Sequence, residues 1–156
     1  MRHIIAILLQ NEAGALTRVA GLFSTRSYNI ESLSVAATQD PTVSRVTLVT
    51  KGSQAAIHQI ASQLLKLVDV VNVEDMTSGS HLERELLLLK LEVPPLRRAA
   101  ADKIIASAGA RAIAESGTQL IVELTSSEVA VTRLIEELAA VARVGEVVRS
   151  GALGIG

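Results

Sequence analysis

The hydrophobic positions of the first 75 residues change their spacing several times, and each change predicts one structural element. Residues 3–9 are a short apolar run rich in Ile and Leu, which is typical of a buried strand. After a polar interruption, apolar side chains recur at the i, i+3, i+4, i+7 spacing of one helical face. They are Leu16, Val19, Ala20 and Phe23. This spacing predicts a helix directly after the first strand.

The next segment has the pattern of two strands joined by a turn. Apolar positions recur with period two over residues 28–38, except that Ile30 is out of phase, which predicts a bulge near Glu31. A turn at residues 40–41 is followed by a run rich in β-branched residues that ends at Gly52. The pattern predicts a hairpin.

The rest of the first half completes a βαββαβ order. Helical spacing returns over residues 57–65, and apolar and polar residues alternate over residues 71–74. Residues 77–82 are mostly polar and have no periodicity, as expected of a linker. We therefore expect a first domain over residues 1–76.

The same order of elements is predicted again over residues 83–156. The predicted elements are a strand over residues 87–93, a helix that opens at Pro94 and Pro95 and runs to about Ala108 with Gly109 as its stop, strands over residues 110–114 and 119–124, a helix after a capping box of Thr125 and Glu128, and a strand over residues 144–149. Two such units in tandem correspond to an α+β fold of two ferredoxin-like sandwiches, each with two helices on one face of an antiparallel sheet. The aliphatic face without helices needs another domain or subunit against it, so we expect a homodimer or a higher oligomer.

Composition excludes several classes of function. Fifteen Lys and Arg residues balance sixteen Asp and Glu residues, and the only aromatic residues are Phe23 and Tyr28, so neither a basic surface nor a stacking platform for nucleic acid is expected. The chain has no Cys, and the longest apolar run has six residues, whereas a membrane-spanning helix needs about 20. We expect a cytoplasmic protein that binds neither nucleic acid nor membrane.

The segment from Asn11 to Gly14, between the first predicted strand and the first predicted helix, is the strongest candidate for a binding site. The first N–H groups of a helix have no partner within the helix, so they can hold a carboxylate without a basic side chain. Gly14 lets a ligand approach the backbone, and Asn11 offers an amide. Asn and Gly are also ordinary capping and turn residues, and that interpretation stays open. A second polar residue, Asn29, lies beside Ile30 at the predicted bulge, and the two segments can approach each other across a dimer.

These segments resemble a known family. Its motifs are NEAGAL at residues 11–16, GLFS at residues 21–24 and YNIESL at residues 28–33. Together they are similar to the ACT domain of the acetolactate synthase small subunit. Further similar segments are residues 44–45, residues 63–64 with 66–70, residues 83–85 with Lys90, and residues 149–151, so the resemblance covers nearly the whole chain.

The resemblance implies a regulatory subunit without catalytic activity, which activates the catalytic large subunit of acetolactate synthase and confers feedback inhibition by valine. The cofactors of that enzyme, thiamine diphosphate, Mg and FAD, are then expected on the large subunit and none on this chain. The family binds valine between paired N-terminal ACT domains. The valine site implied here consists of Asn11, Gly14, Ala15 and Leu16 from one chain and Asn29 and Ile30 from the other.

Two alternatives remain at this point. A free-standing amino-acid sensor acting on another enzyme or regulator would carry the same motifs. A small enzyme of the ferredoxin-like class is the other alternative, but no matched acid, base and nucleophile are present. His3, His58 and His81 share no ligand spacing, so no metal site is expected.

Overall fold

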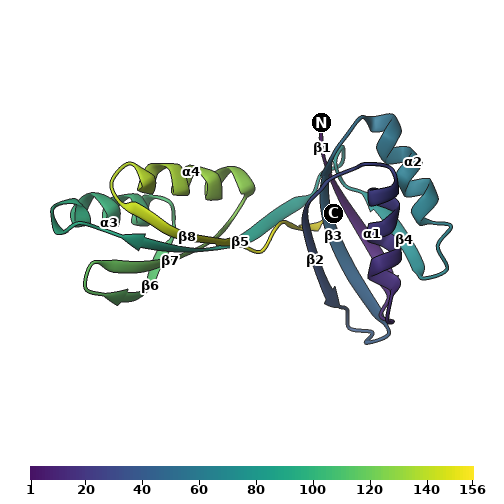
Figure 1. Ribbon diagram of the computed structural model, residues 1–156, viewed down its shortest axis with the longest axis horizontal. Helices are drawn as coiled ribbons and strands as arrows, with labels where there is room; N and C mark the ends of the chain where they lie inside the picture. Colours follow the sequence, from purple (N-terminus) through teal and green to yellow (C-terminus); the bar gives the residue numbers. More distant parts are fainter. The chain divides into compact units, whose positions relative to one another are not determined.

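The first half of the chain forms a four-stranded antiparallel sheet with two helices on one face (Figure 1). The computed structural model describes residues 1–156. The elements are β1 (Arg2–Gln10), α1 (Ala15–Thr25), β2 (Ile30–Ala37), β3 (Val43–Lys51), α2 (Gln54–Leu64) and β4 (Val70–Asp75), and the strand order is β2-β3-β1-β4. The predicted βαββαβ order is therefore confirmed for this half.

The alternation of β1 explains where the core of this unit lies. Ile5, Ile7 and Leu9 point to the helices and are almost fully buried, because every second side chain of a strand lies on the same face. They pack with apolar residues of α1, α2 and β3, namely Ala15, Val19, Phe23, Val46, Leu48, Ile57, Ile60 and Leu64. The core is aliphatic apart from Phe23, which is fully buried, and Tyr28, which packs against it partly buried.

The predicted bulge is present at the beginning of β2. Ile30 lies opposite Thr50, but Ser32 lies opposite Val49, so Glu31 is the extra residue. Because an extra residue in one strand reverses the alternation beyond it, Ile30 and the later apolar positions of β2 can all contribute to the same side.

The second half repeats the order of elements. They are β5 (Leu82–Glu92), a short 3₁₀ turn (Pro95–Arg97), α3 (Arg98–Ser107), β6 (Arg111–Ser116), β7 (Gln119–Ser126), α4 (Glu128–Ala139) and β8 (Arg143–Arg149), with strand order β6-β7-β5-β8. Their buried leucines, isoleucines and valines form a core of their own. None of the helices has both the length and the apolar composition needed to span a membrane.

The division of the chain differs from the sequence division at its C-terminal end. One compact unit comprises residues 1–82 together with residues 152–156, and the other comprises residues 83–151. The sequence division had placed all of residues 83–156 in the second domain. The last residues contain a short strand, β9 (Leu153–Ile155), and the chain passes between the two units twice.

Small residues explain why the C-terminal segment, defined here as residues 152–156, belongs to the first unit. Ala152 is buried with Ile4, Ala6 and Val49 on the face of the sheet that carries no helices. A Cβ atom at Gly154 would lie only 2.9 Å from Ile4 Cδ1, so a larger residue does not fit without displacement. The face that was expected to need another subunit is therefore covered in part by the chain's own end.

Candidate functional site

The beginning of α1 is open to a ligand. Gly14 is its N-cap residue and has φ of 83°, a left-handed conformation that glycine adopts without strain. No side chain caps this helix, whereas Ser53 and Ser127 accept hydrogen bonds from the first turns of α2 and α4. The N–H groups at the start of α1 are thus left without a side-chain partner, and an anion can accept from them.

Asn11 fixes the loop that leads into α1. Its amide nitrogen donates to the carbonyl oxygen of Pro41 at 2.9 Å, and its backbone N–H donates to the carbonyl oxygen of Thr42 at 2.7 Å. The loop is thereby attached to the turn between β2 and β3. The amide oxygen of this exposed side chain makes no hydrogen bond and can accept one from a ligand.

The two apolar residues at the helix start have different surroundings. Ala15 is 1% exposed, its side chain is part of the core, and its N–H already donates to the carbonyl oxygen of Glu12 at 3.3 Å. Leu16 is 36% exposed. Of this pair, Leu16 is the side chain that a bound molecule can contact.

The other two residues implied by the resemblance lie at the opposite end of the sheet. Asn29 is exposed, and its carbonyl oxygen accepts a hydrogen bond from the Thr50 hydroxyl at 2.6 Å. Ile30 pairs with Thr50, which pairs with His3 near the start of β1, whereas the loop before α1 follows Gln10 at the end of β1. At about 3.3 Å per residue, His3 and Gln10 are roughly 23 Å apart along β1. A single chain therefore does not bring the two groups together.

An ion pair that the sequence analysis missed lies beside Gly14. Arg18 Nε and Nη2 lie 2.5 Å and 3.0 Å from the two carboxylate oxygens of Asp69, whose side chain is 6% exposed. A Cβ atom at Gly14 would lie 2.9 Å from Nη1, the guanidinium nitrogen that does not bond to Asp69. The remaining donor of Arg18 thus lies next to the open helix start. The sequence did hold a signal for the position of Arg18 beside Gly14, because residues four apart lie on the same side of a helix.

Asp69 is expected to stabilise the protein only while it is ionised. The hydrogen bond from Arg18 holds the pKa of its carboxyl below the usual value of 3.8. A lowered pKa contributes stability above that value, and the contribution is lost as the pH falls through the folded-state pKa. The parent should therefore be more stable than Asp69→Asn at pH 7, and the difference should shrink below about pH 4.

Urea denaturation of the parent and the variant at pH 7, 5 and 3 measures this difference. Arg18→Met removes the other partner and should flatten the pH dependence in the same way. A stability gap between the parent and Asp69→Asn that stays constant over this pH range would contradict the assignment.

No group of three or more His, Cys, Asp or Glu side chains is arranged to hold a metal ion. Among the three histidines, His3 is buried, and its Nε2 lies 3.2 Å from the carbonyl oxygen of Gly52.

Comparison with known proteins covers both units. The family model for the AHAS small subunit-like ACT domain matches residues 5–72, and the model for the small subunit of acetolactate synthase matches residues 84–156. The chain is 42% identical over 155 residues to the acetolactate synthase isozyme 3 small subunit of Salmonella typhimurium, which covers 99% of this chain and 95% of that protein. Its counterpart from Escherichia coli is 41% identical with the same coverage.

A solved structure agrees with the fold as well. The crystal structure of the acetolactate synthase small subunit from Thermotoga maritima superposes with a TM-score of 0.88 at 28% identity, covering 99% of this chain and 96% of that one. Full-length relatives, both family models and the fold thus confirm the resemblance seen in the motifs. The chain belongs to the family of acetolactate synthase small subunits, which are the regulatory, non-catalytic subunits of that enzyme.

Proposed function

We propose that this chain binds the catalytic large subunit of acetolactate synthase, raises its activity and makes it subject to inhibition by valine. The observation that carries the valine part of the proposal is the uncapped start of α1, where Gly14 is left-handed and a donor of Arg18 lies alongside. A small subunit has a larger partner by definition, and the similarity to such subunits extends over 99% of the chain.

The chemistry of the helix start suits a zwitterion with a short aliphatic side chain. The N–H groups of the first turn and Arg18 Nη1 would receive the carboxylate, because the helix dipole and the guanidinium both favour negative charge there. The free amide oxygen of Asn11 would accept from the ammonium group. Leu16, which is partly exposed, would contact the isopropyl group.

The other half of the proposed site comes from a second copy of the chain. Asn29 and Ile30 lie roughly 23 Å from the α1 loop of their own chain by strand rise, so they can complete the site only in a dimer. The edge position of β2 supports this arrangement, since one side of the strand has unpaired backbone groups. Dimerisation and effector binding are assigned to the N-terminal domain, residues 1–76.

The remaining residues are assigned to control of the partner. Residues 83–156 would convey the effect of valine to the catalytic subunit, with the C-terminal segment attached to the first unit as described above. Thiamine diphosphate, Mg and FAD would be bound by that subunit. A free-standing sensor of the same chemistry is the second candidate, and it differs in having no catalytic partner.

Co-expression with the matching large subunit tests the proposal. We expect the two chains to co-purify, the activity of the large subunit to rise when this chain is added, and valine to inhibit only the assembled enzyme. Valine binding to this chain without association with the large subunit would favour the free-standing sensor. Association without any effect of valine would contradict the effector site.

A further inference from the structure

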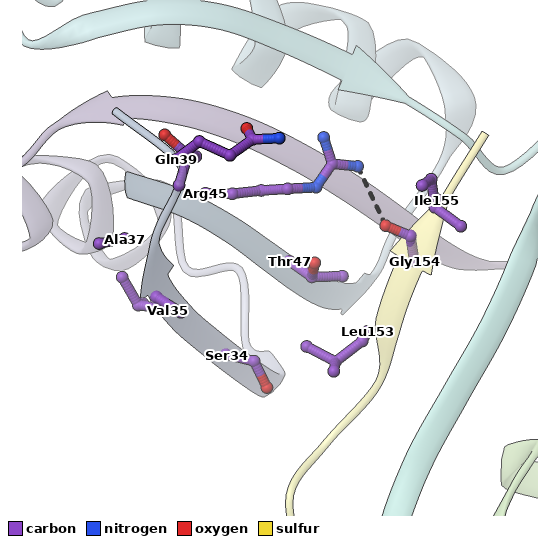
Figure 2. Close-up of a pocket in the computed structure, with 11 residues that line it drawn as sticks. Ser34, Val35, Ala37, Gln39, Arg45, Thr47, Leu153, Gly154 and Ile155 are labelled. Atoms are coloured by element: carbon purple, nitrogen blue, oxygen red, sulfur yellow. Dashed lines mark hydrogen bonds between the residues drawn. The ribbon is translucent and has the colours of Figure 1, made fainter. Parts of the chain in front are cut away.

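A groove of about 490 Å³ lies on the face of the first unit that carries no helices (Figure 2). Ser34 of β2 and Arg45 and Thr47 of β3 line it on one side, and Leu153 and Ile155 of β9 line it on the other. Cavities of this size are typical of small-molecule sites. All of these residues belong to the first unit.

Strand register explains why the groove exists. Ser34 lies opposite Thr47, and Ala36 lies opposite Arg45, so small side chains from β2 share this face with β3. The C-terminal segment packs over β1 and not over β2, because Gly154 lies close to the side chain of Ile4 in β1. The space between β9 and the outer strand is consequently left unfilled.

The groove has an apolar rim that nothing in the unit covers. Leu153 and Ile155, both on β9, are 55% and 65% exposed, respectively. Single exposed aliphatic side chains are common on protein surfaces and need no explanation. Exposed aliphatic side chains that lie together beside a groove indicate a contact site.

Arg45 supplies a charge that has no counterpart. Its Nη2 donates to the carbonyl oxygen of Gly154 at 3.0 Å and lies 3.9 Å from the sulfur of Met76, both of which are neutral partners. Figure 2 shows the side chain extending along the groove toward Gly154. No Asp or Glu lines the groove. A half-buried guanidinium among apolar and hydroxyl groups is best satisfied by an anion.

We propose that this groove binds a small branched aliphatic carboxylate that carries no amino group, that is, a 2-oxo or 2-hydroxy acid. The carboxylate would pair with Arg45, the Thr47 hydroxyl is available to the oxygen on the second carbon, and the branched end would lie against Leu153 and Ile155. An amino acid fits less well, because its ammonium group would have no carboxylate partner and would lie near a guanidinium.

This site is separate from the one proposed at α1 and does not rest on it. The start of α1 belongs to the helix-covered side of the sheet, whereas Arg45 and Thr47 share the opposite face with Ala6. A ligand in the groove would contact both β2 and the C-terminal segment.

Isothermal titration of the full chain with 3-methyl-2-oxobutanoate tests the proposal. The parent should show saturable binding in the millimolar range or tighter, and Arg45→Met should weaken it roughly ten- to a hundredfold, since a charge-assisted hydrogen bond is lost. Arg26→Met, which removes the same charge from an exposed position of the same unit, should leave binding unchanged.

A second variant separates ligand binding from attachment of the C-terminal segment. Arg45→Met also removes the hydrogen bond to Gly154, whereas Ala36→Leu fills the groove and leaves that bond in place. Both variants should weaken binding of the probe, and valine present at saturation should not compete with it. Absence of saturable binding to the parent, binding unchanged in either variant, or competition by valine would each overturn the proposal.

Discussion

Gly14→Asp should weaken valine inhibition at least tenfold and leave activation of the catalytic subunit largely intact. The new carboxylate would lie at the helix start that is proposed to hold the carboxylate of valine, and its Cβ would lie 2.9 Å from Arg18 Nη1. It would therefore repel the ligand and also take up the free donor of Arg18. Losing one charge-assisted hydrogen bond costs about 1.5 to 3 kcal/mol, and about 1.4 kcal/mol corresponds to a factor of ten in affinity. Valine titration of the reconstituted enzyme measures the change.

Gly14→Asn is the matched control for this variant. Asn tolerates the left-handed φ of 83° better than other residues with a side chain, and it is nearly the same size as Asp but uncharged. The Asn variant should lose less valine sensitivity than the Asp variant. Equal losses would show that bulk, and not charge, is responsible.

A mixing experiment tests whether the site is shared between two chains. Asn29→Ala should also weaken inhibition, because Asn29 is proposed to act from the second copy. In a heterodimer of the Gly14→Asp and Asn29→Ala chains, one site has both residues intact and the other has neither. The mixture should regain part of the valine sensitivity that each variant lacks alone. If both variants activate the catalytic subunit and remain as sensitive to valine as the parent, the effector site lies elsewhere.

Phe23→Ala should lower the free energy of unfolding by about 3 to 5 kcal/mol, the largest loss expected of the substitutions proposed for this chain. Phe23 is fully buried between the helices and the sheet, and it is the only fully buried aromatic ring of this core, so the cavity left by its removal is large. Domains are typically stable by only about 5 to 15 kcal/mol, and the loss is therefore a large share of the total. Urea denaturation followed by circular dichroism measures it.

The position of the loss within the chain is part of this prediction. The buried residues of the two units form separate clusters, so Phe23→Ala should destabilise the first unit and leave the second near its parental stability. The transition should broaden or split into two steps. Leu134 is buried in the core of the second unit, so Leu134→Ala should shift the unfolding step of that unit to lower urea concentration. A single sharp transition shifted equally by both variants would contradict independent cores.

Local patterns were enough to predict most of the fold. Most strands and helices have a recognisable period of apolar residues, and the bulge at Glu31 was visible because Ile30 falls out of phase with the positions that follow. One local prediction was wrong. The cap of α4 is Ser127, which accepts from the N–H of Ala130, and not Thr125, because both lie before the helix and the pattern does not distinguish them.

Long-range contacts were not predictable from the same patterns. Arg18 and Asp69 are 51 positions apart, and nothing in either local sequence indicates that they form a pair. The C-terminal segment has small residues and no clear period, so its burial against Ile4 depends on close backbone approach and leaves no periodic signal. The candidate site shows the same dependence on long-range structure. Local motifs indicated the loop before α1 and the pair Asn29 and Ile30, but only the strand register shows that these two groups lie far apart in one chain.

The return of residues 152–156 to the first unit has a consequence for biosynthesis. The unit that the ribosome begins first is the last to be completed, since its final strand is translated after the whole of residues 83–151. At about 5 to 20 residues per second, that interval lasts roughly 3 to 14 s. During this time Ile4, Ala6, Val49 and Met76 have no C-terminal segment over them, so the nascent chain exposes an apolar patch that the finished protein hides.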